Sequence, residues 1–306
     1  MDNAAKVPDA SALQLLESLP QVLKPVRLQR SSEGGEHIVW IVNDSLVLRL
    51  PVEQTDTSTL LREKQLLDLI RKDGGIARLI PWCVGIGSWP SCRNWQYALY
   101  HKVEGISVEH APEAVTNMTE DDLVAFMTSL KKAPVEEARK MGVPTGETVN
   151  DDQLIVAALG ALRRLEANDQ LQASALRKVK LVVPMNRHDL DTSTSTEQVL
   201  THADLKGEHI FVGRDGRVTG IIDWSDAQIG CPSFDISGLA ISVGARMAAR
   251  VARRVGYSAG IVSRGLLMAR SNSLVYLDEV MNAGSDYPEW LIRRQLERAC
   301  EDVEAS

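Results

Sequence analysis

The hydrophobic pattern of this chain changes from strand-like to helical near residue 118, and this change limits the folds that it can form. Residues 26–50 carry two apolar runs separated by an Asn43-Asp44 turn, which is typical of a β-hairpin. A helix is predicted over about 58–72, and residues 79–100 are predicted to form further strand. The first third of the sequence therefore predicts a small antiparallel β unit with one helix.

The rest of the chain is predicted to be largely helical, with one interruption. Helices are predicted over 119–132, 150–167, 170–182, 234–255, 258–282 and 288–303. Residues 199–223 instead hold short apolar runs on both sides of an Asp215-Gly216 turn, which indicates a hairpin. We therefore expect an α+β protein with two lobes, in which the larger, helical lobe carries one hairpin.

The composition predicts a globular protein that binds neither nucleic acid nor membrane. The 306 residues are 44% hydrophobic and 25% charged, which is ordinary for a folded protein. The net charge of -7 argues against nucleic acid as a partner, because phosphate backbones attract basic surfaces. The sequence shows no signal-peptide pattern and no apolar stretch near the roughly 18 residues of a membrane span. We therefore expect a cytoplasmic protein.

The cysteines and the charge distribution add little about chemistry. Four cysteines form neither a CxxC pair nor a dense framework, so we expect reduced thiols and assign them no role. Residues 101–200 hold 16 acidic and 11 basic side chains. This segment either attracts a cationic ligand or forms an ordinary solvated acidic face, and the sequence leaves both interpretations open.

The stretch THADLKGEHIFV, residues 201–212, concentrates reactive side chains. Within eight positions it holds His202, Asp204, Lys206 and His209. It lies in the loop between two predicted strands, and the hairpin that follows ends at Asp223. Such loops favour catalytic residues, because strands fix the ends of the loop while its side chains stay accessible. The residue types alone fit either a metal site or a catalytic loop.

A carboxylate lies on the apolar face of the helix predicted after the first strands. At about 100° per residue, Leu60, Leu67 and Ile70 form one stripe, and Glu63 falls within it. An unpaired buried charge costs several kcal/mol, so Glu63 needs a cationic partner. Arg49, at the end of the preceding strand, is the nearest candidate. Protein kinases hold nucleotide phosphates with such a pair, although a purely structural ion pair has the same signature.

Taken together, these residues follow the order of the protein-kinase motifs. The kinase pattern has H-R-D-L, an Asn five positions after the Asp, and a strand that ends in D-F-G. Here the frame is H-A-D-L-K-G-E-H followed by I-I-D-W-S, with Arg49 and Glu63 upstream. The chain resembles the aminoglycoside phosphotransferase family, which also contains macrolide 2′-phosphotransferases.

Two further features extend this resemblance. A His in place of the Asn is familiar in the macrolide enzymes and in some aminoglycoside 2″-enzymes of this family. Residues 230–235, GCPSFD, are similar to the family's G-D-P-x-x-D element. The resemblance covers about residues 27–300 and is sharpest over 199–240.

The resemblance implies a bilobal protein-kinase-like fold and a phosphotransferase activity. Residues 1–100 would form the nucleotide-binding lobe, 101–105 the hinge, and 106–306 the helical lobe with the catalytic loop and acceptor site. The implied reaction moves the γ-phosphate of GTP or ATP, with Mg²⁺, to a hydroxyl of a small molecule. The implied acceptor is an antibiotic, an aminoglycoside or a macrolide, which O-phosphorylation would inactivate to give resistance. We expect a monomer whose partners are the nucleoside triphosphate and the acceptor.

By the same resemblance, each reactive side chain of the loop receives a role. Asp204 would be the base that orients the acceptor hydroxyl and accepts its proton, and Asp223 and His209 would hold magnesium. Because Mg²⁺ prefers oxygen ligands, His209 would bind it either directly or through water. His202 would brace the loop by hydrogen bonds. Lys206 would reach the transferred phosphate, with an exposed lysine of no special role as the equal alternative.

The first lobe would bind the nucleotide phosphates partly through a loop. Ser32, Gly34 and Gly35 lie between the first two predicted strands, where the family has its phosphate-covering loop. Adjacent glycines let backbone N–H groups approach phosphate oxygens, but two glycines between strands also form ordinary turns.

Side chains and the hinge would complete nucleotide binding. Arg49 departs from the kinase lysine and would bridge the phosphates and Glu63 as a planar fork. In the hinge, backbone groups of His101 and Val103 would face the base. The sequence does not separate ATP from GTP, although the macrolide and 2″-aminoglycoside relatives favour acceptance of GTP.

Three other interpretations explain part of the pattern. A metal-dependent hydrolase would use the same His and Asp residues but leaves Arg49 and Glu63 unexplained. A protein kinase is disfavoured, because 224–229 alone separate the metal-binding Asp from the GCPSFD element and leave no room for an activation segment. A catalytically silent kinase-like protein would be expected to lack Asp204 or Asp223, and both are present.

The acceptor is left open between three classes. A polycationic aminoglycoside would suit the acidic residues of the predicted C-terminal helices, namely Asp278, Glu279, Asp286 and Glu289. A macrolide needs an apolar cleft, which apolar helices such as 236–248 would supply. A metabolic amino-alcohol is the third candidate.

Overall fold

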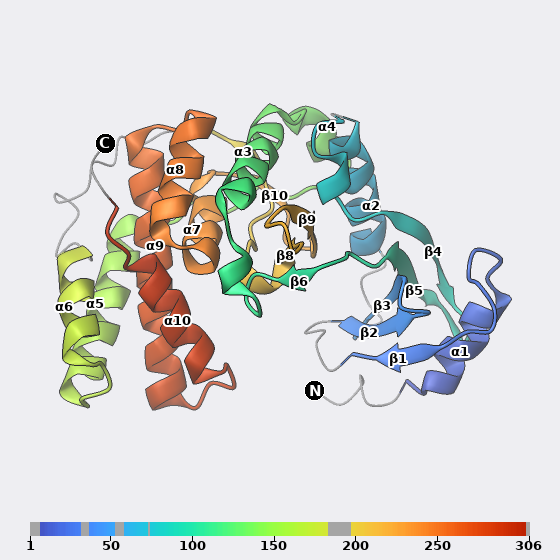
Figure 1. The fold of residues 1–306 in the computed structure, drawn as a ribbon, viewed down its shortest axis with the longest axis horizontal. Helices are drawn as coiled ribbons and strands as arrows, with labels where there is room; N and C mark the ends of the chain where they lie inside the picture. The colour runs from blue at the N-terminus through green and yellow to red at the C-terminus, as the bar shows by residue number, and fades with distance from the viewer. Residues whose placement is uncertain (1–6, 32–36, 53–57, 73, 183–196, 304–306) are drawn as a thin grey trace. The chain divides into compact units, whose positions relative to one another are not determined.

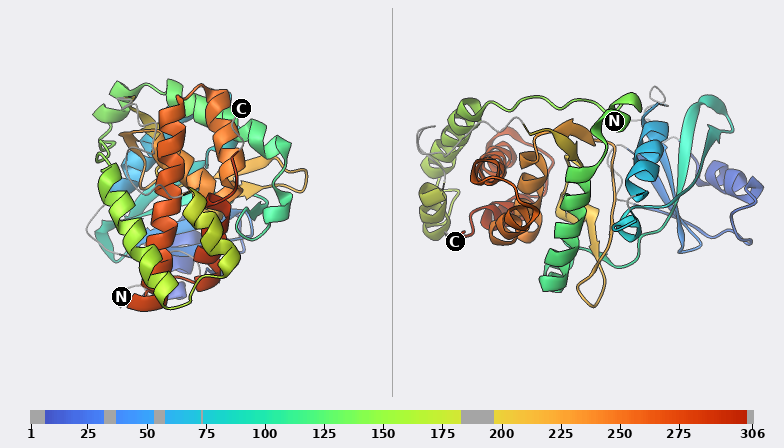
Figure 2. Two further views of the ribbon diagram at one scale, coloured as in Figure 1. Left: turned by 90° about the vertical axis from the view of Figure 1, so that its left-hand side faces the viewer. Right: turned by 90° about the horizontal axis from the view of Figure 1, so that it is seen from above.

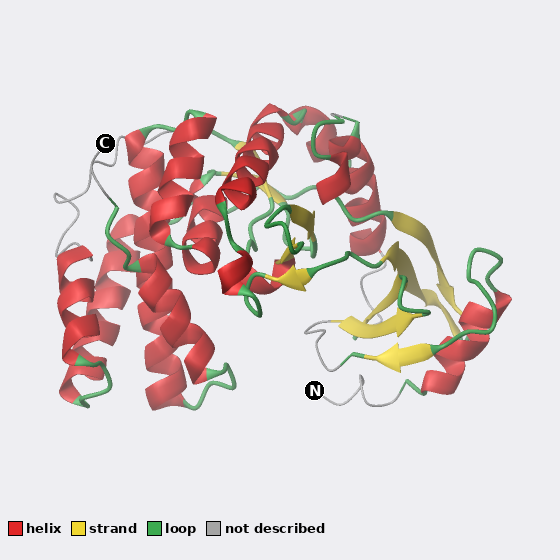
Figure 3. Ribbon diagram, viewed as in Figure 1, coloured by secondary structure: helices red, strands yellow, loops and turns green. Residues whose placement is uncertain are grey.

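The chain divides into two compact units, Met1–Glu104 and Gly105–Ser306. The computed structural model describes residues 7–31, 37–52, 58–72, 74–182 and 197–303. The division between the units falls within the segment predicted as the hinge. Strands dominate the first unit and helices the second (Figure 3). The predicted α+β class, with an antiparallel N-terminal sheet and a helical C-terminal part, is confirmed.

The first unit is an antiparallel sheet with the strand order β1-β2-β3-β5-β4. Its elements are α1 (Asp9–Ser18), β1 (Leu28–Arg30), β2 (His37–Val42), β3 (Leu46–Pro51), α2 (Ser58–Arg71), the 3-10 helix η2 (Ala77–Leu79), β4 (Cys83–Trp89) and β5 (Cys92–His101). The predicted turn between β2 and β3 is present, and Asn43 and Asp44 both have positive φ, of 51° and 57°. Two consecutive left-handed residues make the hairpin turn that matches the twist of its strands.

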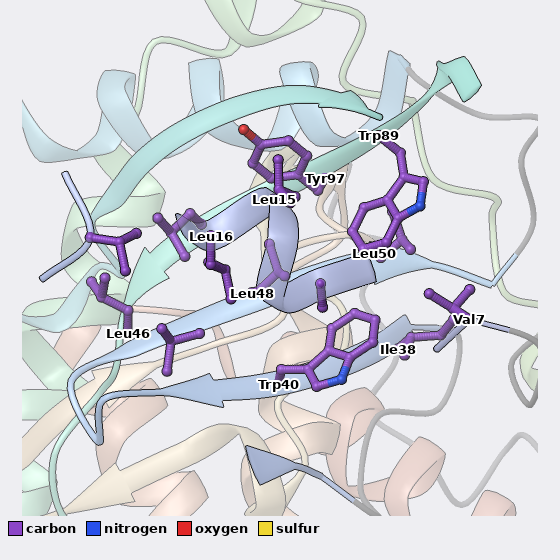
Figure 4. Packing of buried hydrophobic residues seen from close by; sticks show 14 of the residues in the cluster. Val7, Leu15, Leu16, Ile38, Trp40, Leu46, Leu48, Leu50, Trp89 and Tyr97 are labelled. Carbon is purple, nitrogen blue, oxygen red and sulfur yellow. The ribbon is translucent and has the colours of Figure 1, made fainter. Parts of the chain in front are cut away.

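Strand alternation decides which side chains reach each face of this sheet. In β3, Leu46, Leu48 and Leu50 are buried, and the residues between them are half-buried. These leucines share one apolar cluster with Leu16 of α1 and Trp40 of β2 (Figure 4). Helix α1 therefore covers one face of the sheet, and the half-buried residues of β3 point to the other face, where α2 lies (Figure 2).

Helix α1 is absent from the sequence prediction, which gives this unit one helix. It has 10 residues, and its buried side chains are Ala12, Leu15 and Leu16, too few for a helical period to stand out. Asp9 at its start accepts a hydrogen bond from the indole Nε1 of Trp40 at 2.7 Å. This short helix is stabilised by its packing on the sheet rather than by its intrinsic helix propensity.

The second unit is mainly helical, and its described strands form two small sheets (Figure 1). Its helices are α3 (Asn117–Lys132), α4 (Val135–Lys140), α5 (Asp151–Ala167), α6 (Ala173–Val182), α7 (Ser233–Val243), α8 (Ala245–Val255), α9 (Ala259–Asp278) and α10 (Glu289–Ala299). Its strands are β6 (Ile106–Ser107), β7 (Val199–Thr201), β8 (Ile210–Val212), β9 (Val218–Ile221) and β10 (Gln228–Gly230). Single turns are η3 (Pro112–Ala114), η5 (Gly207–His209) and the π-helical η6 (Glu279–Ala283).

Two features of this unit differ from the prediction. The predicted helix 234–255 is two helices, α7 and α8, because Gly244 between them has a φ of 93° that a side chain would strain. Strand β7 pairs with β10, and β6 extends the β8–β9 hairpin. Neither β6 nor β10 is predicted, since strands of two or three residues carry too little pattern to detect.

Helix α9 is the central helix of the second unit. It packs against α5, α7 and α10 (Figures 1 and 2). Leu274 of α9 is fully buried beside Leu165 of α5 and Leu296 of α10. Gly265 permits the approach of α7, since a Cβ at this position would lie 2.6 Å from the side chain of Ile236. No helix in the described part of the chain combines the length and apolarity that a membrane crossing requires.

Gly265→Ala should destabilise the protein, whereas Gly160→Ala should not. The first substitution forces a methyl group into the contact with Ile236 and should cost about 1–3 kcal/mol of unfolding free energy. Gly160 lies in α5, where a Cβ would meet only the Arg164 guanidinium at 3.6 Å, and alanine is the better helix former by about 1 kcal/mol. Urea unfolding of both variants checks this. Equal changes in stability would contradict the close packing of α7 on α9.

Candidate active site

The β8–β9 hairpin brings the two ends of the predicted site together. Ile210 of β8 is in register with Ile221 of β9. The N–H group of Ile222 donates to the carbonyl oxygen of His209 at 2.9 Å. His209, which precedes one strand, therefore lies beside Asp223, which follows the other. This is the convergence that the hairpin pattern predicts.

The buried carboxylate of Asp235, in the first turn of α7, holds the backbone of the loop. Its Oδ2 accepts a hydrogen bond from the N–H of His202 at 3.0 Å, and its Oδ1 accepts one from the N–H of Ala203 at 2.8 Å. Ala203 has a φ of 65°, a left-handed conformation that costs a non-glycine residue roughly 1 kcal/mol or more. Burial raises the pKa of Asp235 to about 7, although both amides lower it. These bonds compensate for the strain of the turn that carries Asp204.

His202 lies fully buried and links the loop to the end of β9. Its Nδ1 accepts a hydrogen bond from the N–H of Asp204 at 3.3 Å. Its Nε2 lies 3.0 Å from the carbonyl oxygen of Ile222, so Nε2 carries the proton and donates. Burial first, and then the charge of His209, lower its pKa to about 3. A neutral imidazole with these two partners makes the bracing contacts expected from the sequence.

Asp204 and Lys206 form an ion pair at the accessible side of the loop. Their Oδ2 and Nζ atoms lie 3.0 Å apart, and 19% of the carboxylate side chain and 44% of the lysine side chain are exposed. Burial lowers the pKa of Lys206, but the charge and hydrogen bond of Asp204 raise it above its ordinary value. Lys206 is therefore a charged group paired with the predicted base, rather than an isolated surface lysine.

His209 is oriented by the main chain of the loop. Its Nδ1 lies 2.8 Å from the carbonyl oxygen of Asp204, which assigns the ring proton to Nδ1. Nε2 lies 3.9 Å from Oδ2 of Asp223 and 3.7 Å from Oε1 of Glu208. The Oδ1 of Asp223 accepts a hydrogen bond from Ser225 at 3.0 Å. Nε2 of His209 and the carboxylate of Asp223 thus lie near each other.

This pair of ligands fits one divalent cation that completes its shell elsewhere. A histidine whose Nδ1–H is bound to a main-chain carbonyl is oriented as metal-binding histidines usually are. Among the residues that the structure describes, no group of three or more His, Cys, Asp or Glu side chains is arranged to hold a metal. Mg²⁺ commonly takes few protein ligands and adds phosphate oxygens and water, so His209 and Asp223 fit this ion.

Asp226 is an acidic residue of the site that the sequence analysis misses. Burial raises its pKa, and the negative charges of Asp204 and Asp223 raise it further. These interactions place it close to both predicted functional aspartates. The sequence signal that could have identified Asp226 was its position shortly after Asp223. It lies in a turn in which the N–H of Ala227 donates to the carbonyl oxygen of Trp224 at 3.1 Å.

In the first unit, the expected ion pair between Arg49 and Glu63 is present. Nη1 of Arg49 lies 3.2 Å from Oε1 of Glu63, and 12% and 2% of the two side chains are exposed. Nη2 lies 3.3 Å from Nδ1 of His37, and the guanidinium lies over the ring of Tyr100, 5.9 Å from its centre. The cation is thus fixed from several sides. Its role in nucleotide binding stays a prediction.

The other residues predicted to bind the nucleotide are described only in part. Ser32, Gly34 and Gly35 lie outside the described residues. The N–H group of His101, at the end of β5, donates to the carbonyl oxygen of Trp82 at 2.9 Å, so it is already used within the unit. Val103 follows two residues later as a half-buried residue without regular secondary structure. The hinge contribution to base binding therefore stays a prediction for Val103 and for the carbonyl of His101.

His202→Gln should change the pH dependence of stability. In the folded protein His202 takes up a proton only near pH 3, whereas its ordinary pKa is 6.5. Between these values the unfolded state binds more protons, so His202 makes the free energy of unfolding fall by about 1.4 kcal/mol per pH unit as the pH falls. Asp235, whose pKa is raised from 3.8 to about 7, acts with the opposite sign in its own window.

The difference between wild type and variant isolates the His202 contribution, because Asp235 is present in both. Gln keeps an N–H donor for the carbonyl of Ile222. Urea unfolding between about pH 4 and pH 6.5 should show the wild type gaining stability over the variant as the pH rises, by about 1.4 kcal/mol per unit. A difference that does not vary with pH would contradict a neutral, buried His202.

Comparison with known proteins adds a family and several folds to this geometry. The model of the phosphotransferase enzyme family matches residues 27–266 of the chain. The matched span contains the Arg49–Glu63 pair and the whole loop and hairpin with Asp204 and Asp223.

Solved structures with a similar fold are aminoglycoside and macrolide phosphotransferases. The GDP complex of aminoglycoside 2'-phosphotransferase-IIIa has a TM-score of 0.67 and 22% identity, covering 98% of this chain and 99% of that one. The GDP and kanamycin complex of APH(2")-IIia has a TM-score of 0.66 and 23% identity, covering 95% and 97%. Macrolide 2'-phosphotransferase MphH from Brachybacterium faecium has a TM-score of 0.55 and 18% identity, covering 96% and 97%. At these identities the likeness concerns the fold.

A short segment also matches a curated protein. The uncharacterized protein YcbJ of Bacillus subtilis (strain 168) is 44% identical over 36 residues, which are 12% of this chain and 12% of that protein's length. This match is too short to carry a function. The family model, by contrast, runs from just before β1 into α9, and the fold agrees with it. The chain belongs to the phosphotransferase enzyme family, as its catalytic-loop motif predicted.

Proposed function

We propose that this protein transfers the γ-phosphoryl group of GTP or ATP to a hydroxyl group of an aminoglycoside or macrolide antibiotic. Membership of the phosphotransferase enzyme family gives the reaction class, and the donor, the acceptor and the residue roles are the proposal. The observation that carries it is the convergence of Asp204, Lys206, His209 and Asp223 on one loop and hairpin.

In this mechanism Asp204 receives the acceptor hydroxyl. Phosphoryl transfer passes through a loose, highly charged transition state, so the protein mainly orients the reactants and neutralises phosphate oxygens. The carboxylate of Asp204 is partly exposed, and its backbone is fixed, so it can accept a hydrogen bond from the hydroxyl and then its proton. Lys206 would leave its contact with Asp204 for the transferred phosphate, where its positive charge is needed.

His209 and Asp223 would hold Mg²⁺ together with phosphate oxygens of the donor. When bound, the ion neutralises the charge that develops on the phosphates. His209 would offer Nε2 to the ion, because its Nδ1 is already bonded to the carbonyl oxygen of Asp204. Asp223 contributes the negative charge, and its second oxygen is oriented by Ser225.

The first unit would bind the nucleotide. The guanidinium of Arg49 can contact phosphate oxygens while it stays paired with Glu63, because its N–H groups form a planar fork. Related folds are known as complexes with GDP for aminoglycoside 2'-phosphotransferase-IIIa and with ADP for APH(2'')-Ib, which supports a nucleotide donor. The other proposed nucleotide contacts are Ser32, Gly34, Gly35, His101 and Val103.

Two of the four acidic residues expected to attract a polycationic acceptor are already paired with arginine. Asp278 accepts hydrogen bonds from Nε and Nη2 of Arg164 at 2.8 and 2.6 Å. Glu289 pairs with Arg293 one helical turn later at 2.7 Å. The charge available to an aminoglycoside at the end of α9 is therefore smaller than the sequence suggests.

Two tyrosines supply a partly exposed aromatic surface in the second unit. The rings of Tyr276 and Tyr287 lie 5.9 Å apart, and 42% and 57% of these residues are exposed. Burial raises the pKa of Tyr276, as do its neighbours Tyr287 and Glu279. An acceptor with an apolar face and an amine, such as a macrolide, suits this surface. A metabolic amino-alcohol is the second candidate, because half of the expected acidic charge is paired.

The proposal is tested by a panel of aminoglycosides, macrolides and amino-alcohols, each incubated with Mg²⁺ and GTP or ATP and analysed by mass spectrometry. The wild type should add one phosphoryl group to at least one acceptor. Asp204→Asn should lower the rate roughly 10²–10⁴-fold, because the amide cannot accept the proton, while the nucleotide dissociation constant stays unchanged.

The matched control is Asp215→Asn, in the exposed turn at the far end of the same hairpin, which should keep full activity. No mass gain on any acceptor with either nucleotide would overturn the proposed function. Full activity of Asp204→Asn would overturn the role of Asp204.

His209→Asn should change the metal preference. The variant replaces the imidazole nitrogen by an amide oxygen, which Mg²⁺ prefers, so activity with Mg²⁺ relative to Mn²⁺ should rise several-fold. The check is the transfer rate as a function of each ion, with Mn²⁺ binding in the presence of GDP followed by electron paramagnetic resonance. Identical metal profiles and Mn²⁺ affinities would show that the imidazole does not touch the ion.

A further inference from the structure

Glu109 is a buried carboxylate that contacts the catalytic loop from outside the predicted site. It follows β6 and is 4% exposed. Its N–H donates to the carbonyl oxygen of Gly207 at 3.1 Å. A Cβ at Gly207 would lie 2.5 Å from Oε2 of Glu109, so the loop and this carboxylate are in direct contact.

Two arginines of α10 fix this carboxylate. Nη1 of Arg298 lies 3.0 Å from its Oε2, and Nη1 of Arg294 lies 3.3 Å from its Oε1 and 3.0 Å from its carbonyl oxygen. The two arginines are one helical turn apart, so both reach the same carboxylate. Arg298 is nearly buried, and its Nη2 has no hydrogen-bond partner in the part of the chain that the structure describes. Its charge is therefore balanced chiefly by Glu109.

The contact with Gly207 bears on two predicted functional residues. Gly207 begins η5, with Lys206 directly before it and His209 at its end. The N–H of His209 donates to the carbonyl oxygen of Lys206 at 3.0 Å, and this hydrogen bond links the two ends of the turn. The hydrogen bonds of Asp235 hold the first part of the loop, at His202 and Ala203.

We propose that Glu109, clamped by Arg294 and Arg298, is a positioning residue for phosphoryl transfer, because it sets the place of the Lys206–His209 turn relative to Asp204. The proposal rests on the proposed function of the same loop. It assigns the second part of the loop a support that is independent of Asp235. In this arrangement α10 influences the position of Lys206 and His209 through the carboxylate of Glu109.

Glu120 of α3 is a matched control within the same unit. It is 7% exposed and is also paired with two arginines one helical turn apart, Arg250 at 2.8 Å and Arg254 at 3.1 Å. These arginines belong to α8, and within the part of the chain that the structure describes no hydrogen bond or ion pair joins Glu120 to the loop. Substitution of either carboxylate should therefore lower stability, but only substitution of Glu109 should also affect the loop.

The test compares Glu109→Gln with Glu120→Gln. Both variants should lower the melting temperature by similar amounts. Glu109→Gln alone should speed hydrogen exchange of the backbone amides over 206–210, with the exchange of His202 and Ala203 unchanged. It should also lower kcat by roughly tenfold or more, because small misplacements of reacting groups are costly, while the KM for nucleotide changes less than about twofold.

Two milder substitutions test the proposal if the Glu109→Gln variant does not fold. Arg294→Gln and Arg250→Gln each remove one arginine that is about 40% exposed, 39% and 42%, from its carboxylate. Only Arg294→Gln should loosen the turn and lower kcat. Unchanged exchange over 206–210, or equal kcat losses at the two sites, would overturn the proposal.

Hydrogen exchange also separates this proposal from the proposed function, because it needs no turnover. A wild type that phosphorylates no acceptor, with exchange still faster in Glu109→Gln alone, would overturn the function and leave the contact between Glu109 and the turn established. A wild type that transfers phosphate, with no site-specific effect of Glu109→Gln, would overturn the positioning role alone.

Discussion

The loop that carries the proposed base depends on two hydrogen bonds, which the consecutive amides of His202 and Ala203 donate to the carboxylate of Asp235. They hold Ala203 in a left-handed conformation, and this turn sets the direction of Asp204. The bonds are effective because the carboxylate is almost fully buried, where water does not compete for it. Asp235 is fixed in turn by α7, which packs closely on α9 at Gly265. The position of the proposed base is therefore set by the helical core of the second unit.

Buried carboxylates paired with arginines give this unit much of its specific geometry. Such pairs add little net stability, because desolvation of the charges offsets their attraction, but they penalise any arrangement that separates them. Glu120 joins α3 to α8 in this way, and Glu109 joins α10 to the turn before His209. The same chemistry reduces the negative charge at the proposed acceptor side, where Arg164 pairs with Asp278. An acidic residue that the sequence offered for binding an aminoglycoside is thus used for structure.

Those parts of the site that depend on short-range sequence patterns could be predicted. The helical stripe that contains Glu63 and the nearest basic residue before it were sufficient for the Arg49–Glu63 pair. The hairpin turn was sufficient to bring His209 and Asp223 together. Contacts between distant segments could not be predicted, because the hydrophobic periodicity shows which face of an element is buried but not which element covers it. Glu109 and Arg298, for example, are 189 positions apart. Helix α1, strands β6 and β10 and the break at Gly244 likewise depend on neighbours far away in the sequence.

The central claim is that an acceptor hydroxyl, rather than water, meets the transferred phosphoryl group at Asp204. Phosphorus NMR of a reaction that contains the wild-type protein, Mg²⁺, GTP or ATP and the acceptor found by mass spectrometry tests this most directly. The account predicts that the γ-phosphate signal is replaced by a phosphomonoester signal coupled to protons of the acceptor, in equal amount to the nucleoside diphosphate formed. Release of the γ-phosphate as inorganic phosphate alone, with no phosphomonoester, would contradict it and assign a hydrolase to this loop.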